Sequence, residues 1–150
     1  RLPGSSLSAA TNAFASSSSD EPAYPPPTSA AGGPTVGTTF VAPASGSVKV
    51  DYSAYLQNTI NAGATIQSFE MKTGGTIGSG TLVGSAANSD RAIICGKAVV
   101  ASGPSIVHAG NWAIYTGLTP GATYNVRMMH AVDGGTGSTF YRQILVQPQI

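Results

Sequence analysis

One stretch of the chain decides the fold: Gly117-Leu118-Thr119-Pro120-Gly121-Ala122-Thr123-Tyr124-Asn125-Val126-Arg127-Met128. Pro120 presets φ for the first central position of a β-turn, and Gly121 tolerates the positive φ that can follow it. Beyond the turn, successive side chains point to opposite faces of an extended strand. One face of that strand carries Tyr124, Val126, Met128 and His130. The stretch therefore predicts a tight turn that leads directly into a β-strand.

The spacing Leu-x-Pro-Gly-x-x-Tyr-x-Val in this stretch resembles the tyrosine corner of immunoglobulin-like and fibronectin type III domains. In such a corner, a Tyr at the start of a late strand bonds its hydroxyl to nearby backbone. The resemblance implies that Pro120, Gly121 and Tyr124 are structural corner residues. It also implies an antiparallel sandwich of two sheets.

Short segments with strand patterns recur along the rest of the chain. The clearest alternation runs from Val48 to Gln57, and another strand is expected from Ala64 to Thr73. In that second strand Ile66 and Phe69 fall on opposite faces, which predicts a β-bulge between them. Further strands are expected at 39–42, 91–101, 111–118, 124–131 and 139–146, with brief pairing at 105–107 and a glycine-rich strand or loop at 76–83.

Roughly seven to nine short strands without helical periodicity favour an all-β fold, an antiparallel β-sandwich. We expect this domain to span residues 36–150. Immunoglobulin-like, fibronectin III-like and jelly-roll-like topologies all satisfy the pattern.

Residues 1–35 have a different composition, rich in Ser, Ala and Pro, with runs at 16–19 and 25–27. A segment of this low complexity cannot bury enough apolar surface to offset its ordering entropy. We therefore expect an extended low-complexity arm that docks on other proteins; an interdomain linker is the alternative. The arm side chains able to anchor it are Leu2, Leu7, Phe14 and Tyr24.

Charge and composition disfavour several classes of function. Charged residues are 9% of the chain and the net charge is +1, so nucleic acid and anionic membranes are not expected partners. No apolar run approaches the ~20 residues of a membrane helix, and the first residues do not form a signal peptide. The start without Met suggests a chain that begins earlier or was processed. A single cysteine, Cys95, excludes an internal disulfide and leans towards assembly in a reducing cytoplasm.

The residues that carry chemistry do not form a recognisable catalytic or metal motif. The two histidines, His108 and His130, are expected in a loop and a strand, as structural or surface residues. The carboxylates are scattered, and Asp133 with Gly134 is typical of a hairpin turn rather than a calcium loop. Cys95 lies in an apolar strand, where an inert buried thiol is expected. We therefore expect no catalytic residue, metal or cofactor, and no enzyme.

Aromatic residues are the best candidates for a binding surface. Exposed rings on a β-sandwich can stack on sugars or contact other proteins. The candidate ligand or interface aromatics are Trp112, Tyr55, Tyr115 and Tyr141. The alternative is that half or more of the aromatic side chains belong to the core.

Two runs of the chain carry a family resemblance. The first is Thr39-Phe40-Val41-Ala42-Pro43 with Ser45, Gly46, Val48 and Val50; the second is the 117–127 stretch followed by His130, Gly134 to Gly137, Arg142, Ile144, Val146 and Pro148. Together they resemble the C-terminal β-sandwich domain of virion structural proteins from tailed phages of actinobacteria. The resemblance covers residues 38 to 148 and leaves out the arm.

The resemblance implies a non-enzymatic place in the virion. It implies a capsid decoration or head-fibre subunit, or a minor tail protein, assembled in the host bacterial cytoplasm. Its partners would be the major capsid protein or other virion proteins, and the chain would form a homo-oligomer, a dimer or a trimer. The alternative function is a tail-fibre tip that binds a carbohydrate or receptor of the host surface.

Overall fold

The protein is a β-sandwich built from two antiparallel sheets. The computed structural model describes residues 13–17, 35–60, 63–84, 92–96 and 103–150, and within these ranges every regular element is a strand. The strands are β1 (Ala13–Ser17), β2 (Gly37–Val41), β3 (Val48–Asn58), β4 (Ala64–Thr73), β5 (Ile93–Gly96), β6 (Ser105–Tyr115), β7 (Thr123–Asp133) and β8 (Gly137–Pro148). This confirms the predicted fold class.

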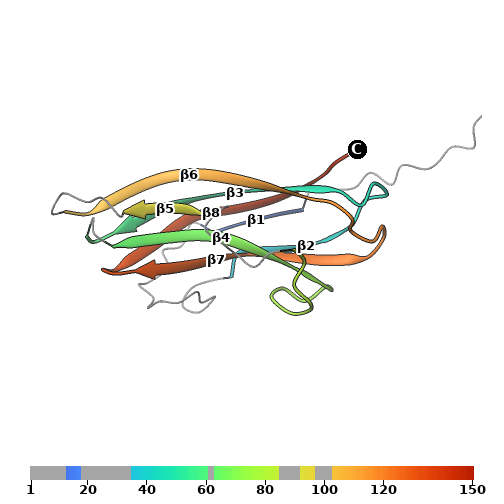
Figure 1. Cartoon of the computed structure of the whole chain (residues 1–150), viewed down its shortest axis with the longest axis horizontal. Helices are drawn as coiled ribbons and strands as arrows, with labels where there is room; N and C mark the ends of the chain where they lie inside the picture. The colour runs from blue at the N-terminus through green and yellow to red at the C-terminus, as the bar shows by residue number, and fades with distance from the viewer. Residues whose placement is uncertain (1–12, 18–34, 61–62, 85–91, 97–102) are drawn as a thin grey trace, which may run out of the picture.

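The strand order identifies the topology as a jelly roll. Sheet A has the order β1-β8-β3-β6, and sheet B has the order β2-β7-β4-β5. The first strand pairs with the last, the second with the seventh, the third with the sixth and the fourth with the fifth. The chain is thus one long hairpin that is doubled on itself and rolled into two layers (Figure 1). Of the topologies that the sequence left open, the jelly roll is the one that forms.

The strands that the sequence predicts most clearly are close to those observed, but two local predictions are wrong. β4 pairs with β7 in unbroken register from Ala64 to Thr73, so the predicted bulge is absent. Thr65 and Gln67 lie on the inner side with Phe69, which leaves Ile66 on the outer side without any break in alternation. The irregularity lies instead where β3 pairs with β8, and Tyr141 has a φ of 50° there.

Strand β6 corrects a second prediction. It runs without interruption through Ser105–Tyr115, where the sequence predicted two short segments with His108 in a loop between them. Eleven consecutive register pairs with β3 hold it in place, from Val48 opposite Tyr115 to Asn58 opposite Ser105. Long-range pairing therefore overrides the local preference of Ala109 and Gly110 for a turn.

The core lies between the sheets and is supplied mainly by the inward side chains of β3, β4, β7 and β8. These residues are almost inaccessible to solvent: Val48, Val50, Ala54, Leu56, Phe69, Met71, Val126, Met128, Ile144 and Val146. Near the first residues of β4, the space between the two sheets becomes polar. Thr139 Oγ1 donates to Gln67 Oε1 at 2.9 Å, and Gln67 Nε2 donates to the carbonyl of Met129 at 2.7 Å. His130 and Arg142 are buried as well, so His130 is an interior residue.

The predicted tyrosine corner forms, although the topology is a jelly roll. The backbone N–H of Thr119 donates to Tyr124 Oη at 3.0 Å. Gly121 has a φ of 77° and donates its N–H to the carbonyl of Ala42. The Tyr124 ring stacks on Phe40 at 5.8 Å between centroids, which ties the start of β7 to β2.

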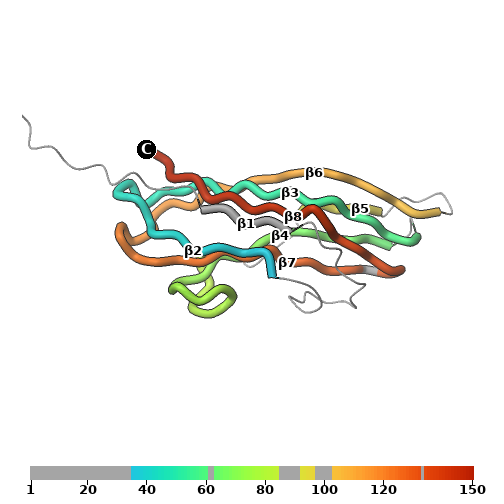
Figure 2. Tube along the Cα trace, turned by 180° about the vertical axis from the view of Figure 1, so that it is seen from behind, coloured from blue at the N-terminus to red at the C-terminus, as the bar shows by residue number. Residues whose placement is uncertain are grey.

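A glycine-rich loop after β4 folds against sheet B and is held by one buried amide. Asn125 Oδ1 accepts from the Gly78 N–H at 2.9 Å, and its Nδ2 donates to the carbonyls of Gly74 and Ser79 at 3.0 and 3.1 Å. This loop lies at 74–84, where the sequence left strand or loop open, and only Leu82 forms a bridge, to Lys72. In Figure 2 the loop is the green segment beside β7 and β4.

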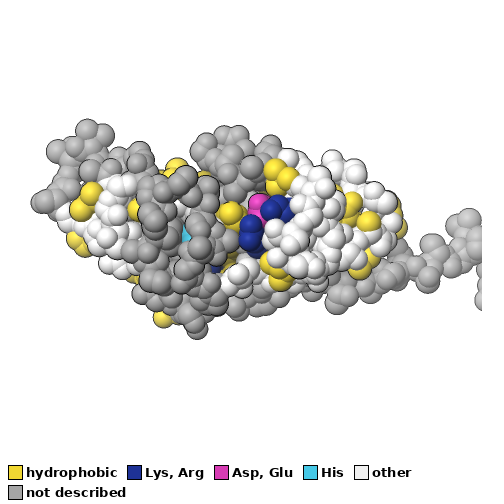
Figure 3. All heavy atoms as spheres, turned by 90° about the horizontal axis from the view of Figure 1, so that it is seen from below, with side chains coloured by type: hydrophobic (Ala, Val, Ile, Leu, Met, Phe, Trp, Pro, Cys, Tyr) yellow, Lys and Arg dark blue, Asp and Glu magenta, His cyan; other side chains and the backbone are white. Residues whose placement is uncertain are grey.

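The charged side chains of sheet B gather beside the same loop. Glu70 Oε1 accepts from Arg127 Nε at 2.6 Å and from Lys72 Nζ at 3.1 Å. Figure 3 shows basic side chains next to an acidic one on the face seen from below. Glu70 thus pairs with both of these basic side chains, Arg127 and Lys72.

Part of the predicted arm belongs to the sandwich. Ala13–Ser17 form β1 at the edge of sheet A, paired with Arg142 to Val146 of β8. Phe14 is opposite Leu145 in this pairing. The other predicted arm anchors, Leu2, Leu7 and Tyr24, lie outside the described residues.

Candidate functional site on the outer face of sheet A

The solvent face of sheet A gathers large apolar side chains. On β6 the exposed fractions are 56% for Ile106, 55% for Trp112 and 52% for Ile114. Tyr141 of β8 is 56% exposed, and Leu145 of the same strand is partly exposed. An apolar patch of this kind on a charge-poor sheet is typical of an interaction surface.

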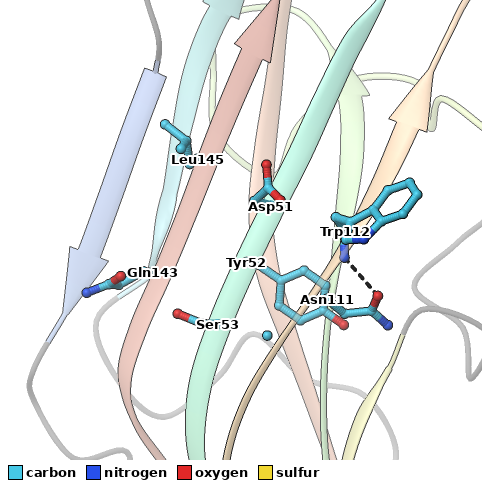
Figure 4. A pocket seen from close by; sticks show the side chains of 8 residues that line it. Asp51, Tyr52, Ser53, Asn111, Trp112, Gln143 and Leu145 are labelled. Carbon is cyan, nitrogen blue, oxygen red and sulfur yellow. Dashed lines mark hydrogen bonds between the residues drawn. The ribbon is translucent and has the colours of Figure 1, made fainter.

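The register arranges these side chains in rows across β8, β3 and β6. One row is Leu145, Asp51 and Trp112, and the next is Gln143, Ser53 and Gly110. The second row holds small side chains on β3 and β6, so the sheet is hollowed there. The hollow has a volume of about 260 Å³, and Trp112 stands at its rim (Figure 4).

An aromatic cluster lies in the next row along β3, beyond Ser53 and Gly110, and its residues do not line the hollow. Tyr55 of β3 stacks on Phe140 of β8 at 4.2 Å between centroids, and Tyr141 meets Phe140 edge-on at 5.6 Å. His108 of β6 lies 6.1 Å from Tyr55, in the neighbouring position of the same row. The hollow therefore has a floor of small residues with Trp112 on one side, and the aromatic cluster lies in the row beyond it.

The polar groups at the Trp112 border include one charged pair. Lys49 Nζ lies 2.6 Å from Asp51 Oδ1 and 5.5 Å from the centre of the Trp112 ring. The second carboxylate oxygen, Asp51 Oδ2, has no hydrogen-bond partner among the described residues. The side chains of Ser53, Asn111 and Gln143 complete the polar lining. This combination offers a ring face beside hydrogen-bonding groups and contains no nucleophile with an adjacent base.

The aromatic residues predicted from sequence are only partly brought together here. Trp112 and Tyr141 lie exposed on this face and Tyr55 is half-buried on it. Tyr115, the last residue of β6, is 8% exposed and packs in the core, so it is not part of the surface. Asp51, Ser53 and Gly110 were not singled out from sequence; their only signal was the alternation of β3 and β6.

The cysteine and the two histidines, which the sequence analysis considered as reactive or metal-binding residues, lie apart from one another. Cys95 is buried in β5, and burial raises the pKa of its thiol, as expected for an inert cysteine. His108 lies on the outer face of sheet A, while His130 lies in the interior. Within the described ranges no three His, Cys, Asp or Glu side chains come together as metal ligands.

Comparison with known proteins does not assign this chain to a family. A scan against protein-family models gives no match, and a search of curated proteins finds no similar sequence. In the described part of the chain no helix has the length and apolar character needed to cross a membrane.

Proposed function

We propose that the protein is a non-enzymatic structural protein of a phage virion, a capsid decoration or head-fibre subunit. The observation that carries the proposal is the patch of half-exposed apolar side chains on the outer face of sheet A. An exposed apolar patch is unfavourable in water. Such a patch is typical of a surface to which another molecule binds. The jelly roll is itself a common fold of viral capsid domains, which supports the proposal by analogy.

In this proposal the N-terminal arm docks the sandwich on the major capsid protein or on another virion protein. Residues 1–12 precede β1, so they can reach a neighbour while β1 stays in sheet A. A stretch of 12 residues spans at most about 40 Å when fully extended. That reach exceeds the width of the four-stranded sheet A, since neighbouring strands are about 4.8 Å apart.

Co-sedimentation with viral shells that lack this protein tests the proposal. The full chain is compared with one truncated before Ala13 and one that lacks residues 1–35. The first truncation keeps β1, so we expect it to fold normally and to lose saturable binding to shells. If it binds as well as the full chain, residues 1–12 are not the anchor. If neither the full chain nor the truncated ones bind, the decoration role is refuted.

A second candidate function is a tail-fibre tip that binds a carbohydrate of the host surface. The observation that favours it is Trp112, which presents more than half of its surface beside the hollow. A sugar ring can stack on an exposed indole, and sugar hydroxyls can hydrogen-bond to the polar side chains that line the hollow, such as Ser53 and Gln143. The hollow beside this ring has a volume of about 260 Å³.

Binding to a panel of host-surface glycans tests this second function. Trp112→Ala removes the stacking surface, and Ile114→Ala is the matched control because Ile114 is equally exposed two residues along β6. We expect glycan binding to be lost in the first variant and kept in the second. Equal binding by both variants would remove Trp112 from the site, and no binding by the unmodified protein would exclude the carbohydrate function.

A further inference from the structure

Strand β6 is a long sheet edge that no other described strand covers. Sheet A ends at β1 and β6, and sheet B ends at β2 and β5. Three of these edges are short, with five residues in β1 and β2 and four in β5, but β6 has eleven. Figures 1 and 2 both show β6 along one margin of the sandwich. A long edge strand offers a row of backbone groups to any strand that can pair with it.

The sequence of β6 lacks the usual protection of an exposed edge. Proteins blunt edge strands with Lys, Pro, bulges or inward-pointing charges. Ser105–Tyr115 contains no Pro, Lys, Arg, Asp or Glu, and its pairing with β3 has no bulge. The edge is therefore both uncharged and regular.

One hydrogen bond shows which backbone groups point away from the sandwich. The N–H of Trp112 donates to Asn111 Oδ1 at 2.8 Å, so this N–H is turned away from β3. Backbone direction alternates along a strand, and every second residue shares the orientation of Trp112. The outward backbone groups are thus those of Ile106, His108, Gly110, Trp112 and Ile114, all of which are exposed residues.

These five residues form a pattern that is symmetric about Gly110. His108 lies two residues before Gly110 and Trp112 two residues after it. Ile106 lies four residues before Gly110 and Ile114 four residues after it. If a second β6 approaches antiparallel with its Gly110 opposite Gly110, each ring meets a ring and each Ile meets an Ile. Cross-strand pairs of these kinds stabilise sheets, and the absence of charge avoids repulsion across the axis.

We propose that two copies of this chain pair through β6 about a two-fold axis at Gly110. The two four-stranded sheets then form one continuous sheet of eight strands, with Trp112 opposite the partner's His108. An isologous contact of this type is self-complementary, which fits the symmetric pattern better than an unrelated strand does. The carbonyl of the partner's His108 replaces Asn111 Oδ1 as the acceptor for the Trp112 N–H. Both hollows remain open on the same face.

Cysteine cross-linking of the full chain tests the axis directly. In an antiparallel pair at Gly110 the two Cα atoms are about 5.5 Å apart, within the range of a disulfide. A Cβ at Gly110 sits 3.1 Å from the Tyr52 carbonyl oxygen, so the substitution requires a small shift and no positive φ. We expect Gly110→Cys to form dimers under mild oxidation, while the unmodified protein, whose Cys95 is buried, does not.

Ile106→Cys provides the matched control for register. Each Ile106 lies opposite the partner's Ile114, so two Cys side chains at position 106 are separated by eight residues, about 26 Å. Ile106→Cys alone should not cross-link, but a mixture of Ile106→Cys and Ile114→Cys should. Self-cross-linking of Ile106→Cys with none for Gly110→Cys would overturn the proposed axis.

A pair of proline variants separates edge pairing from folding. Ile114→Pro removes an outward N–H, whereas Ala113→Pro removes a bond to β3. Sedimentation equilibrium should show a dimer. Ile114→Pro should raise its dissociation constant at least about tenfold with little change in melting temperature, whereas Ala113→Pro should lower the melting temperature. Asn111→Ala frees the Trp112 N–H and should strengthen the dimer. A protein that stays monomeric at every concentration refutes the proposal, whatever the outcome of shell or glycan binding.

Discussion

The buried amide of Asn125 gives the sharpest test of how the loop after β4 is held on sheet B. Asn125 is 1% exposed and fixes the loop through one accepted bond, from Gly78, and two short donated bonds, to Gly74 and Ser79. Each such bond contributes about 1 kcal/mol net, and Asn125→Ala removes all three. We expect the free energy of unfolding to fall by about 3 kcal/mol. For a domain of this size that corresponds to a melting temperature lower by roughly 6–12 °C.

Urea unfolding followed by Trp112 fluorescence measures this change, and hydrogen exchange at the Gly78 amide reports the loop itself. Asn125→Asp is the informative companion because it retains the acceptor for Gly78 but turns a carboxylate towards the carbonyls of Gly74 and Ser79. The free energy of unfolding of Asn125→Asp should be lower than that of the unmodified protein. This difference should shrink as the pH falls, because the protonated carboxyl group can donate a hydrogen bond. A loss below about 1 kcal/mol for Asn125→Ala, with the Gly78 amide still protected, would refute the reasoning.

Three further predictions concern single side chains. Tyr124→Phe removes the acceptor for the Thr119 N–H and should cost about 1 kcal/mol in urea unfolding; an unchanged stability would mean that water replaces the hydroxyl. Trp112→Ala should change stability by less than about 0.5 kcal/mol, because the ring lies outside the core; a larger loss would show that the indole supports the sheet. The Cys95 thiol, with its pKa raised by burial, should react with a thiol reagent at pH 8 only as fast as the sandwich opens, and immediate reaction of the native protein would contradict its placement.

The strands could be predicted where one face is apolar and the turn chemistry is local. The alternation of β3 and the turn before Tyr124 each depend on a few neighbouring residues, and both predictions are confirmed. The bulge prediction failed because it considered only the apolar residues Ile66 and Phe69 and left out the polar residues between and beside them, Thr65 and Gln67. Both side chains point inward and are satisfied there, Gln67 by Thr139 and by the Met129 carbonyl.

The binding face could be predicted only in part. Trp112 and Tyr141 were identified by residue type, which does not distinguish them from Tyr115 in the core. What separates these residues is the pairing of β6 with β3, whose paired residues are 47 (Asn58 with Ser105) to 67 (Val48 with Tyr115) positions apart. The hollow depends on the same pairing, because Ser53 and Gly110 become neighbours only when β3, β6 and β8 are in register. Asn125 was missed for a similar reason, since its partners lie about 50 residues earlier in the chain.

The exposure of β6 follows from topology and not from its own sequence. In this strand order β6 pairs with β3 and has no second neighbour among the described strands of sheet A. Threonine or lysine at Ile106, Trp112 and Ile114 would leave the core untouched, because these side chains point away from it and are more than half exposed. Packing among the described residues therefore does not explain three large apolar residues on one face of an uncharged edge. The β6–β6 dimer that we propose would explain them, because the pattern about Gly110 is symmetric and fits a second copy of the same strand.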